Sequence, residues 1–348
     1  MLLDDLMAPA IEQGASDIHL LPGSRPALRN SVGEIKFDQS APALSESAIK
    51  GIISCYLQDQ DDWKRIERQR RYDITITSHG RRIRLHSFRQ QNGWTAAFRL
   101  LRSSILPLAE IGGPQVLSDI LEHRSGLVLI TGPGGSGKST TLTAGVDQIN
   151  QTQERNIVTA EEPIEMVHTP MRCTISQRSM PGDVLSLEDA VFDALRGDCN
   201  VFVAGELRDA QSIRAAVTAA DTGLLVLATA HGRNATGSVQ RIIDAFPAEA
   251  KDLARSMLAD SLRLVAAQAL VKTTDGQKRV AVFETLTSSP AVRNIVRSGR
   301  LEQLESIMQS GAQQGMTTFR QSVGSLVSRR VISEKDGAQI LRGRAHDV

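Results

Sequence analysis

One glycine-rich segment constrains this chain more than any other feature of its sequence. The segment is Gly132-Pro133-Gly134-Gly135-Ser136-Gly137-Lys138-Ser139-Thr140, which has the spacing of a P-loop. It follows an apolar run at 126–131 that predicts a buried parallel strand, and it precedes a segment at 141–146 that predicts the start of a helix. A strand, a glycine-rich turn and a helix in this order distinguish a P-loop from a chance glycine-rich turn. We therefore predict that the chain binds a nucleoside triphosphate.

The residue types in this segment suit a phosphate chain. Glycines let the backbone fold around the anion, so that several N–H groups and the positive end of the following helix point at it. Lys138 would add a positive charge at the β- and γ-phosphates, and Ser139 would hold Mg²⁺. The expected nucleotide-binding residues of the segment are Gly132, Gly134, Gly135, Ser136, Gly137, Lys138, Ser139 and Thr140.

Composition limits the classes of protein that the chain can belong to. Its 348 residues are enough for two domains, and 40 Lys and Arg against 39 Asp and Glu leave a net charge of +1. A near-neutral chain with 3% aromatic residues offers neither an electrostatic track nor stacking platforms, so we expect no nucleic-acid partner. No apolar run approaches the roughly 20 residues that span a bilayer, and three scattered cysteines indicate reduced thiols in a cytoplasm.

Hydrophobic periodicity predicts two domains of the α/β class. Residues 1–105 read as a small domain with a helix at 1–13, a strand at 17–20, a helix at 46–57 capped by Ser45, and an antiparallel meander over 72–100. Residues 106–114 carry prolines and glycines and read as a linker. From 115 to 348 strands and helices alternate, which predicts a parallel sheet. There we expect a long amphipathic helix over 252–270, a strand at 280–284, and short helices beyond Pro290.

Acidic residues or a histidine follow three of the predicted parallel strands. Glu206 ends the apolar run 201–205, where P-loop enzymes place an acid beside the Mg²⁺ site. Glu161, Glu162 and Glu165 follow the strand 157–160, and their mutual repulsion indicates a nearby cation or arginines. One of the three could orient or deprotonate the attacking water. His231 follows the strand 224–229, either near the phosphates or as a structural histidine.

Taken together, these segments resemble the secretion ATPase superfamily, and most of all the type IV pilus retraction ATPases. The resemblance spans the chain and depends on short motifs rather than on composition. The matching segments are 14–20, the P-loop, the acidic segment 161–165, the segment 205–209 around Glu206, Thr229-Ala230-His231, Phe246-Pro247-Ala248-Glu249, and the C-terminal signature 290–297.

The resemblance implies a role for individual residues. Glu165 is similar to the catalytic glutamate that polarises water, with Glu161 supporting the nucleotide site. Glu206 resembles the Walker B acid, which with Ser139 would hold Mg²⁺, and His231 a sensor near the γ-phosphate. Arg84 and Arg99 match arginines that reach the nucleotide of a neighbouring subunit. Without the resemblance, the basic side chains on that face of the meander would indicate only a solvated sheet face.

The family implies a PAS-like N-terminal domain, a RecA-like ATPase domain with a C-terminal helical region, and a homohexamer. It would hydrolyse ATP with Mg²⁺ to drive pilus retraction, in the cytoplasm and bound peripherally to the inner membrane through a platform protein. An assembly ATPase or a second retraction ATPase would be a further partner. Two alternatives remain: an accessory or secretion- and conjugation-type ATPase of the same superfamily, and a nucleotide-gated scaffold with little turnover. Two departures from the family motivate the scaffold. The acidic segment reads Ala160-Glu161-Glu162, where the family usually has an apolar β-branched residue, Glu and Asp, and Leu224 stands where the family often has a histidine.

Overall fold

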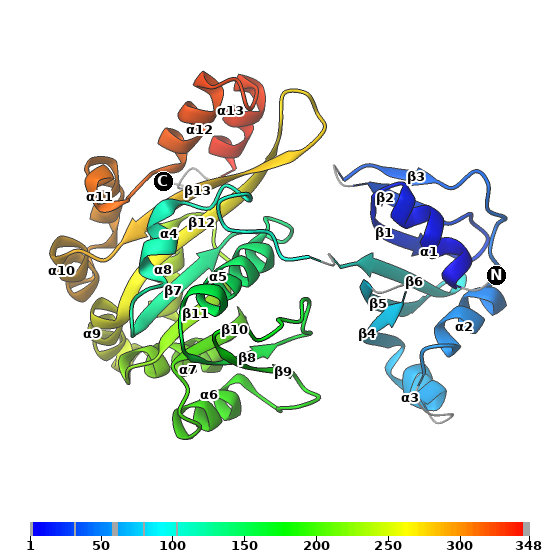
Figure 1. The fold of residues 1–348 in the computed structure, drawn as a ribbon, viewed down its shortest axis with the longest axis horizontal. Coiled ribbons are helices and arrows are strands. Elements are labelled where there is room, and N and C mark those ends of the chain that lie inside the picture. Colours follow the sequence, from blue (N-terminus) through cyan, green and yellow to red (C-terminus); the bar gives the residue numbers. More distant parts are fainter. Residues whose placement is uncertain (1–2, 31–32, 58–61, 79–80, 102–103, 344–348) are drawn as a thin grey trace. The chain divides into compact units, whose positions relative to one another are not determined.

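Two separate sheets organise the computed structural model of the chain, one in each of two units, Met1–Ser104 and Ile105–Val348 (Figure 1). The structure describes residues 3–30, 33–57, 62–78, 81–101 and 104–343. Within these residues, no helix combines the length and the apolar character that crossing a membrane requires.

The first unit is built on a six-stranded sheet with the strand order β3-β2-β1-β6-β5-β4, in which every neighbouring pair is antiparallel. Its strands are β1 (Ala15–Leu20), β2 (Ala27–Asn30), β3 (Ile35–Phe37), β4 (Arg71–Ser78), β5 (Arg81–Gln90) and β6 (Gly93–Leu100). Its helices are α1 (Leu3–Glu12), α2 (Glu46–Ser54) and α3 (Asp62–Gln69).

Alternation along the strands of the first unit separates a covered face from a polar face. Ile83, Leu85, Trp94 and Phe98 alternate with polar residues and pack with apolar residues of all three helices in one core. The expected meander of β4, β5 and β6 is confirmed, and so is the cap of α2, where the Ser45 hydroxyl accepts from the Ala48 N–H at 3.2 Å. The other face of the sheet carries arginines, histidines and aspartates.

The second unit is built on a seven-stranded sheet with the order β13-β12-β7-β11-β10-β8-β9. Its strands are β7 (Gly126–Thr131), β8 (Asn156–Glu161), β9 (Thr174–Ser179), β10 (Val201–Leu207), β11 (Leu225–Ala230), β12 (Leu262–Lys272) and β13 (Arg279–Thr287). All neighbours are parallel except β12 and β13, which confirms the parallel sheet expected from the alternating pattern.

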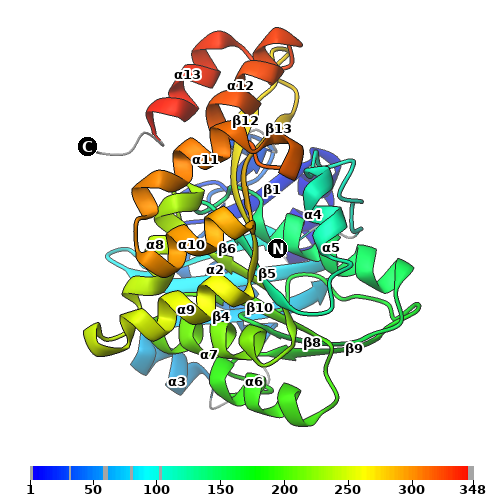
Figure 2. The ribbon, with the colours of Figure 1, turned by 90° about the vertical axis from the view of Figure 1, so that its left-hand side faces the viewer.

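Helices cover both faces of this sheet. The helices are α4 (Gln115–Ile120), α5 (Lys138–Thr152), α6 (Leu187–Arg196), α7 (Ala210–Asp221), α8 (Ala235–Asp244), α9 (Lys251–Ser261), α10 (Pro290–Ser298), α11 (Leu304–Ser310), α12 (Phe319–Ser328) and α13 (Glu334–Arg342). Three short 3-10 turns complete them at Ala248–Ala250, Leu301–Gln303 and Ala312–Gln314. Apolar residues of α4 and α5 pack on one face, and those of α6 to α11 pack on the other (Figures 1 and 2). Because both faces are covered, β7 and β11 are buried along their whole length.

The expectation of one long helix over 252–270 is wrong. Helix α9 ends at Ser261, and the chain continues directly as strand β12. The segment Leu264 to Ala269 is buried on both sides of the sheet, between β7 and β13. A strand with two buried faces has a continuous apolar sequence without period-two alternation, and such a run is not distinguished from a buried helix by periodicity. The strand expected at 280–284 and the short helices after Pro290 are confirmed.

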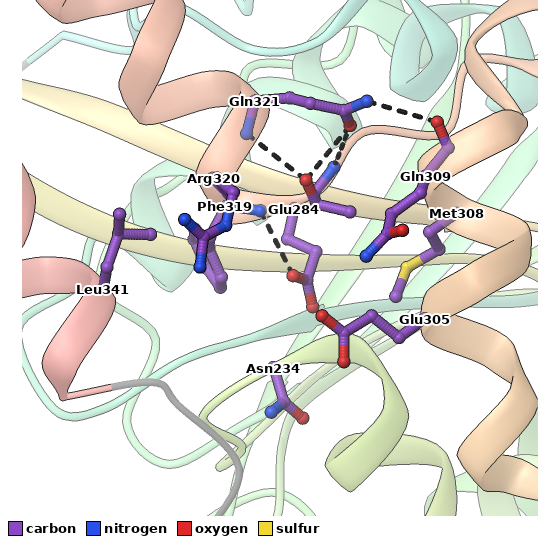
Figure 3. Close-up of a pocket in the computed structure, with 10 residues that line it drawn as sticks. Asn234, Glu284, Glu305, Met308, Gln309, Phe319, Arg320, Gln321 and Leu341 are labelled. Carbon is purple, nitrogen blue, oxygen red and sulfur yellow. Dashed lines mark hydrogen bonds between the residues drawn. The ribbon is translucent and has the colours of Figure 1, made fainter.

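A buried glutamate joins two helices, α8 and α12, to the sheet. Glu284 of β13 is 7% exposed, and its two carboxylate oxygens accept from the first N–H of two helices. Ala235 of α8 donates at 2.8 Å, and Phe319 of α12 donates at 3.2 Å. Figure 3 shows this carboxylate at the side of a pocket of about 620 Å³, together with Glu305 and Arg320. Glu284 therefore anchors α8 and α12 to β13, while α12 and α13 pack on β12 and β13 through an apolar core.

Candidate active site

The P-loop lies between β7 and α5, as its sequence predicts. Strand β7 ends at Thr131, and α5 begins at Lys138, so the glycine-rich turn occupies the six positions between them. Gly137 caps the helix with φ of 92°, and Gly135 has φ of 73°, two conformations that residues with a Cβ rarely adopt. The sequence needs glycine at these two positions because the backbone turns there in the left-handed region.

Close approach of another strand explains a further glycine. A Cβ on Gly132 would lie 2.5 Å from the backbone oxygen of Gln268 on β12 and 2.4 Å from the hydroxyl of Ser136. The Gln268 side chain, in turn, accepts a hydrogen bond from Thr141 of α5 at 2.8 Å. Strand β12 therefore supports the P-loop from the side, a contact between residues more than 120 positions apart.

Lys138 lies on the carbonyls of its own loop. Its Nζ donates to the oxygens of Gly132 at 3.0 Å and Pro133 at 3.2 Å, and the residue is 9% exposed. Burial lowers the pKa of Lys138 below its usual range, and the charges of Glu206 and Glu165 oppose that shift. Lys138 is thus within electrostatic reach of both Glu206 and Glu165.

Glu206 is the centre of a charged cluster. Its Oε1 lies 2.8 Å from Nε2 of His231, and its Oε2 accepts from Nε of Arg208 at 2.7 Å. Arg208 also donates through Nη1 to Glu162 at 2.7 Å. Burial raises the pKa of Glu206, but the Arg208 hydrogen bond and the charges of Arg208, His231 and Lys138 outweigh it and lower the pKa overall. Glu206 is therefore a carboxylate at neutral pH, at the carboxyl end of β10.

The acidic segment after β8 is arranged around one glutamine. Gln177 of β9 donates to Oε1 of Glu161 at 3.2 Å and to the Met166 carbonyl at 2.8 Å. Its Oε1 accepts from the backbone N–H of His168 at 2.8 Å. Glu161 also accepts from Thr159 at 2.7 Å. The segment that carries the half-buried Glu165 is thereby fixed to the edge of the sheet.

Arg84 and Arg99 belong to the first unit, on its polar face. They are direct cross-strand neighbours on β5 and β6. Their side chains are 35% and 62% exposed, and each donates through Nε to an aspartate. The structure thus places Arg84 and Arg99 side by side in the first unit. The second unit contains the other predicted site residues, Lys138, Glu165, Glu206 and His231.

Three polar residues of the site were missed from the sequence. Arg208 had a usable signal, because it lies two positions after Glu206, where its side chain can return to that acid. Gln177 and Gln268 had none, since each acts through a strand that adjoins the site only after the sheet has formed. Ser139, by contrast, is exposed at the first turn of α5, where its hydroxyl can reach a ligand of the P-loop.

The same fold and sequence occur in known proteins. The family model of type II/IV secretion system proteins matches residues 1–340. The chain is 37% identical over 340 residues to the type IV pilus retraction ATPase PilT of Pseudomonas aeruginosa, which covers 97% of this chain and 98% of that protein. It is 45% identical over 252 residues to a twitching motility protein of Neisseria gonorrhoeae, which covers 72% of this chain and 67% of that protein.

A solved structure agrees with these relatives. The crystal structure of the pilus retraction motor PilT with bound ADP superimposes with a TM-score of 0.87 at 33% identity, over 98% of this chain and 97% of that one. The chain belongs to the type II/IV secretion system protein family. The resemblance identified in the sequence and the α/β fold class are therefore confirmed.

Proposed function

We propose that this chain is an ATPase that drives the retraction of a type IV pilus. The observation that carries the proposal is the charged cluster at the P-loop, where Lys138, Glu206 and His231 converge between β7, β10 and β11. The similarity over nearly the full length to the retraction ATPase PilT of Pseudomonas aeruginosa supports the process. The similarity to the crystal structure of a PilT with bound ADP supports the nucleotide.

The proposed roles follow from position and charge. The P-loop residues 132–140 bind the phosphates of ATP, and Lys138 leaves its loop carbonyls to pair with them. Glu165 orients the attacking water. It is the glutamate that the family resemblance makes catalytic, and its charge acts on Lys138 of the P-loop. His231 contacts Glu206 and connects the state of that acid to the loop before α8. Glu161 supports the same segment through Gln177.

The residues present also fit Mg²⁺. Magnesium takes hard oxygen ligands, and the site offers the Ser139 hydroxyl and a Glu206 carboxylate whose lowered pKa keeps it ionised. When bound, the ion would neutralise charge that develops on the phosphates. Arg208 and His231 already hold Glu206 in place, and thus pre-order it for this role.

The working form that we propose is a homohexamer in the cytoplasm, attached to the inner membrane through a pilus platform protein. An assembly ATPase or a second retraction ATPase would act on the same pilus. In the ring, Arg84 and Arg99 of one copy act on the nucleotide of the adjacent copy. Both arginines belong to the first unit and the P-loop belongs to the second, which is consistent with arginines and P-loop supplied by different copies.

Turnover by three variants tests the enzymatic part. Lys138→Ala and Glu165→Gln should each abolish Mg²⁺-dependent phosphate release, while Glu302→Gln, at an exposed acid outside the cluster and the family motifs, serves as the control. Equal rates for Lys138→Ala and wild type would favour a nucleotide-gated scaffold instead. In cells that lack the chain, surface pili should accumulate without retracting; an unchanged pilus number would point to another cargo, such as a secretion system.

Mixing variants tests the proposed action across copies. Lys138→Ala has intact arginines and an inactive site, whereas Arg99→Ala has an intact site without that arginine. Rings formed from both should turn over faster than the sum of the two variants alone, because one copy supplies what the other lacks. A strictly additive rate would exclude catalysis by arginines of a neighbour.

A further inference from the structure

The polar face of the first unit contains two like charges side by side, which calls for a physical explanation. Arg99 of β6 and Arg84 of β5 are directly opposite in the register. Like charges at such cross-strand positions repel each other and destabilise the pair. Each arginine, however, has an aspartate on the strand that lies beyond it, β1 for Arg99 and β4 for Arg84. The two carboxylates therefore hold each guanidinium on the side away from the other.

The contacts are alike at the two positions. Nε of Arg99 donates to Oδ1 of Asp17 at 2.9 Å, and Nε of Arg84 lies 3.4 Å from Oδ1 of Asp73. In both arginines the Nη nitrogens make no hydrogen bond to any residue that the structure describes. A guanidinium held by its Nε side keeps the opposite edge available for a second anion, and that edge fits a phosphate in bidentate fashion.

Each aspartate is itself held by its second oxygen. Oδ2 of Asp17 accepts from the Ser16 hydroxyl at 2.9 Å and lies 3.9 Å from Nε of Arg29. Oδ2 of Asp73 lies 2.7 Å from Nδ1 of His86, which is its direct cross-strand neighbour. One oxygen is thus fixed by the sheet and the other is directed at the arginine. Such an arrangement limits the rotamers of a long side chain before any ligand arrives.

We propose that Asp17 and Asp73 are positioning residues, which orient Arg99 and Arg84 so that their Nη groups face the phosphates of the adjacent copy. The inference rests on the proposed function, in which those arginines act across copies. Asp17 is the stronger of the two, because its side chain is 11% exposed and its contact is shorter, against 44% exposure for Asp73. A misplaced catalytic group loses rate rather than substrate affinity, so the effect appears in kcat.

A double-mutant cycle on the full chain tests the proposal. Asp17→Asn should lower kcat of ATP hydrolysis by about 10- to 100-fold with KM changed less than about 3-fold. In an Arg99→Ala background, Asp17→Asn should have no further effect, because the residue it positions is gone. Asp38→Asn changes a half-buried carboxylate in the turn after β3 of the same unit, where it accepts from the backbone N–H and the hydroxyl of Ser40, and should leave kcat unchanged. Thermal unfolding of each variant separates positioning from loss of the fold.

The outcomes distinguish the inference from the function on which it rests. The positioning role of Asp17 is overturned if Asp17→Asn lowers kcat by the same factor in the Arg99→Ala background as in wild type, or if it leaves the kcat of wild type unchanged. In either case the proposed role of Arg99 itself is not affected. If Arg99→Ala alone leaves kcat unchanged, Arg99 has no role in catalysis, and the positioning role of Asp17 is overturned as well. Should Asp17→Asn unfold the unit, the parallel cycle of Asp73→Asn and Arg84→Ala decides, with an expected loss of about 3- to 10-fold.

Discussion

Replacing Glu284 by alanine should measurably destabilise the second unit. The carboxylate is 7% exposed and accepts from the first N–H of α8 at 2.8 Å. It also accepts from the first N–H of α12, that of Phe319, at 3.2 Å (Figure 3). A hydrogen bond to a charged group contributes about 1.5–3 kcal/mol, so two are worth about 3–6 kcal/mol at most. Because the adjoining pocket of about 620 Å³ admits water to the freed amides, we expect the lower end, about 3 kcal/mol.

The measurement is thermal unfolding of the full chain. For a unit of this size, about 3 kcal/mol corresponds to a fall in Tm of about 6–12 °C. Glu284→Gln keeps one acceptor oxygen and should lose about half as much. Gln309→Ala truncates an exposed side chain that lines the same pocket and should shift Tm by less than about 1 °C. If Glu284→Ala melts within about 2 °C of wild type, the two hydrogen bonds do not anchor the helices and the reasoning is refuted.

Two further predictions concern the site. Gly132→Ala should cost about 1–3 kcal/mol of stability, because its Cβ would collide with the Gln268 backbone oxygen. In the control Gly134→Ala the added Cβ meets nothing within 4 Å and should cost under about 0.5 kcal/mol. Equal losses in urea unfolding would contradict this expectation. Burial lowers the pKa of His168 from 6.5, with Asp147 opposing, so the unfolded chain takes up the proton at higher pH than the folded one. Stability should therefore fall as the pH drops below about 6.5 towards the pKa of His168 in the folded state. The variant His168→Gln should show a smaller fall in Tm between pH 7.5 and 5.5 than wild type. If Tm falls equally with pH in both proteins, the titration of His168 does not contribute.

The features that can be predicted from the sequence are those that depend on a few neighbouring residues. The P-loop was readable because glycine spacing, Lys138 and the flanking strand and helix are contiguous. Ser45 was readable as a cap because a hydroxyl at that position can serve a nearby N–H. The expectation of a meander in the first unit depends on the alternation of apolar and polar residues, which is clearest at 72–77 and 82–86.

What sequence could not provide depends on contacts between distant segments. The pattern over 252–270 predicts one helix, yet Leu262–Lys272 is a strand, because burial on both faces removes the alternation that marks a strand. Glu284 gave no sign of binding two helix ends, since its partners lie 49 and 35 positions away. The aspartate beside Arg99 lies 82 positions from it, and only the pairing of β1 with β6 brings them together.

The position of β12 has a consequence for any shortened form of the chain. The P-loop strand β7 has β11 on one side and β12 on the other, so half of its pairing comes from residues that follow Ser261. A fragment that ended at α9 would retain the whole glycine-rich motif, yet it would expose an apolar strand edge prone to aggregation. The nucleotide motif is therefore not a detachable module, and the protein must be synthesised well past it before that motif has a stable place.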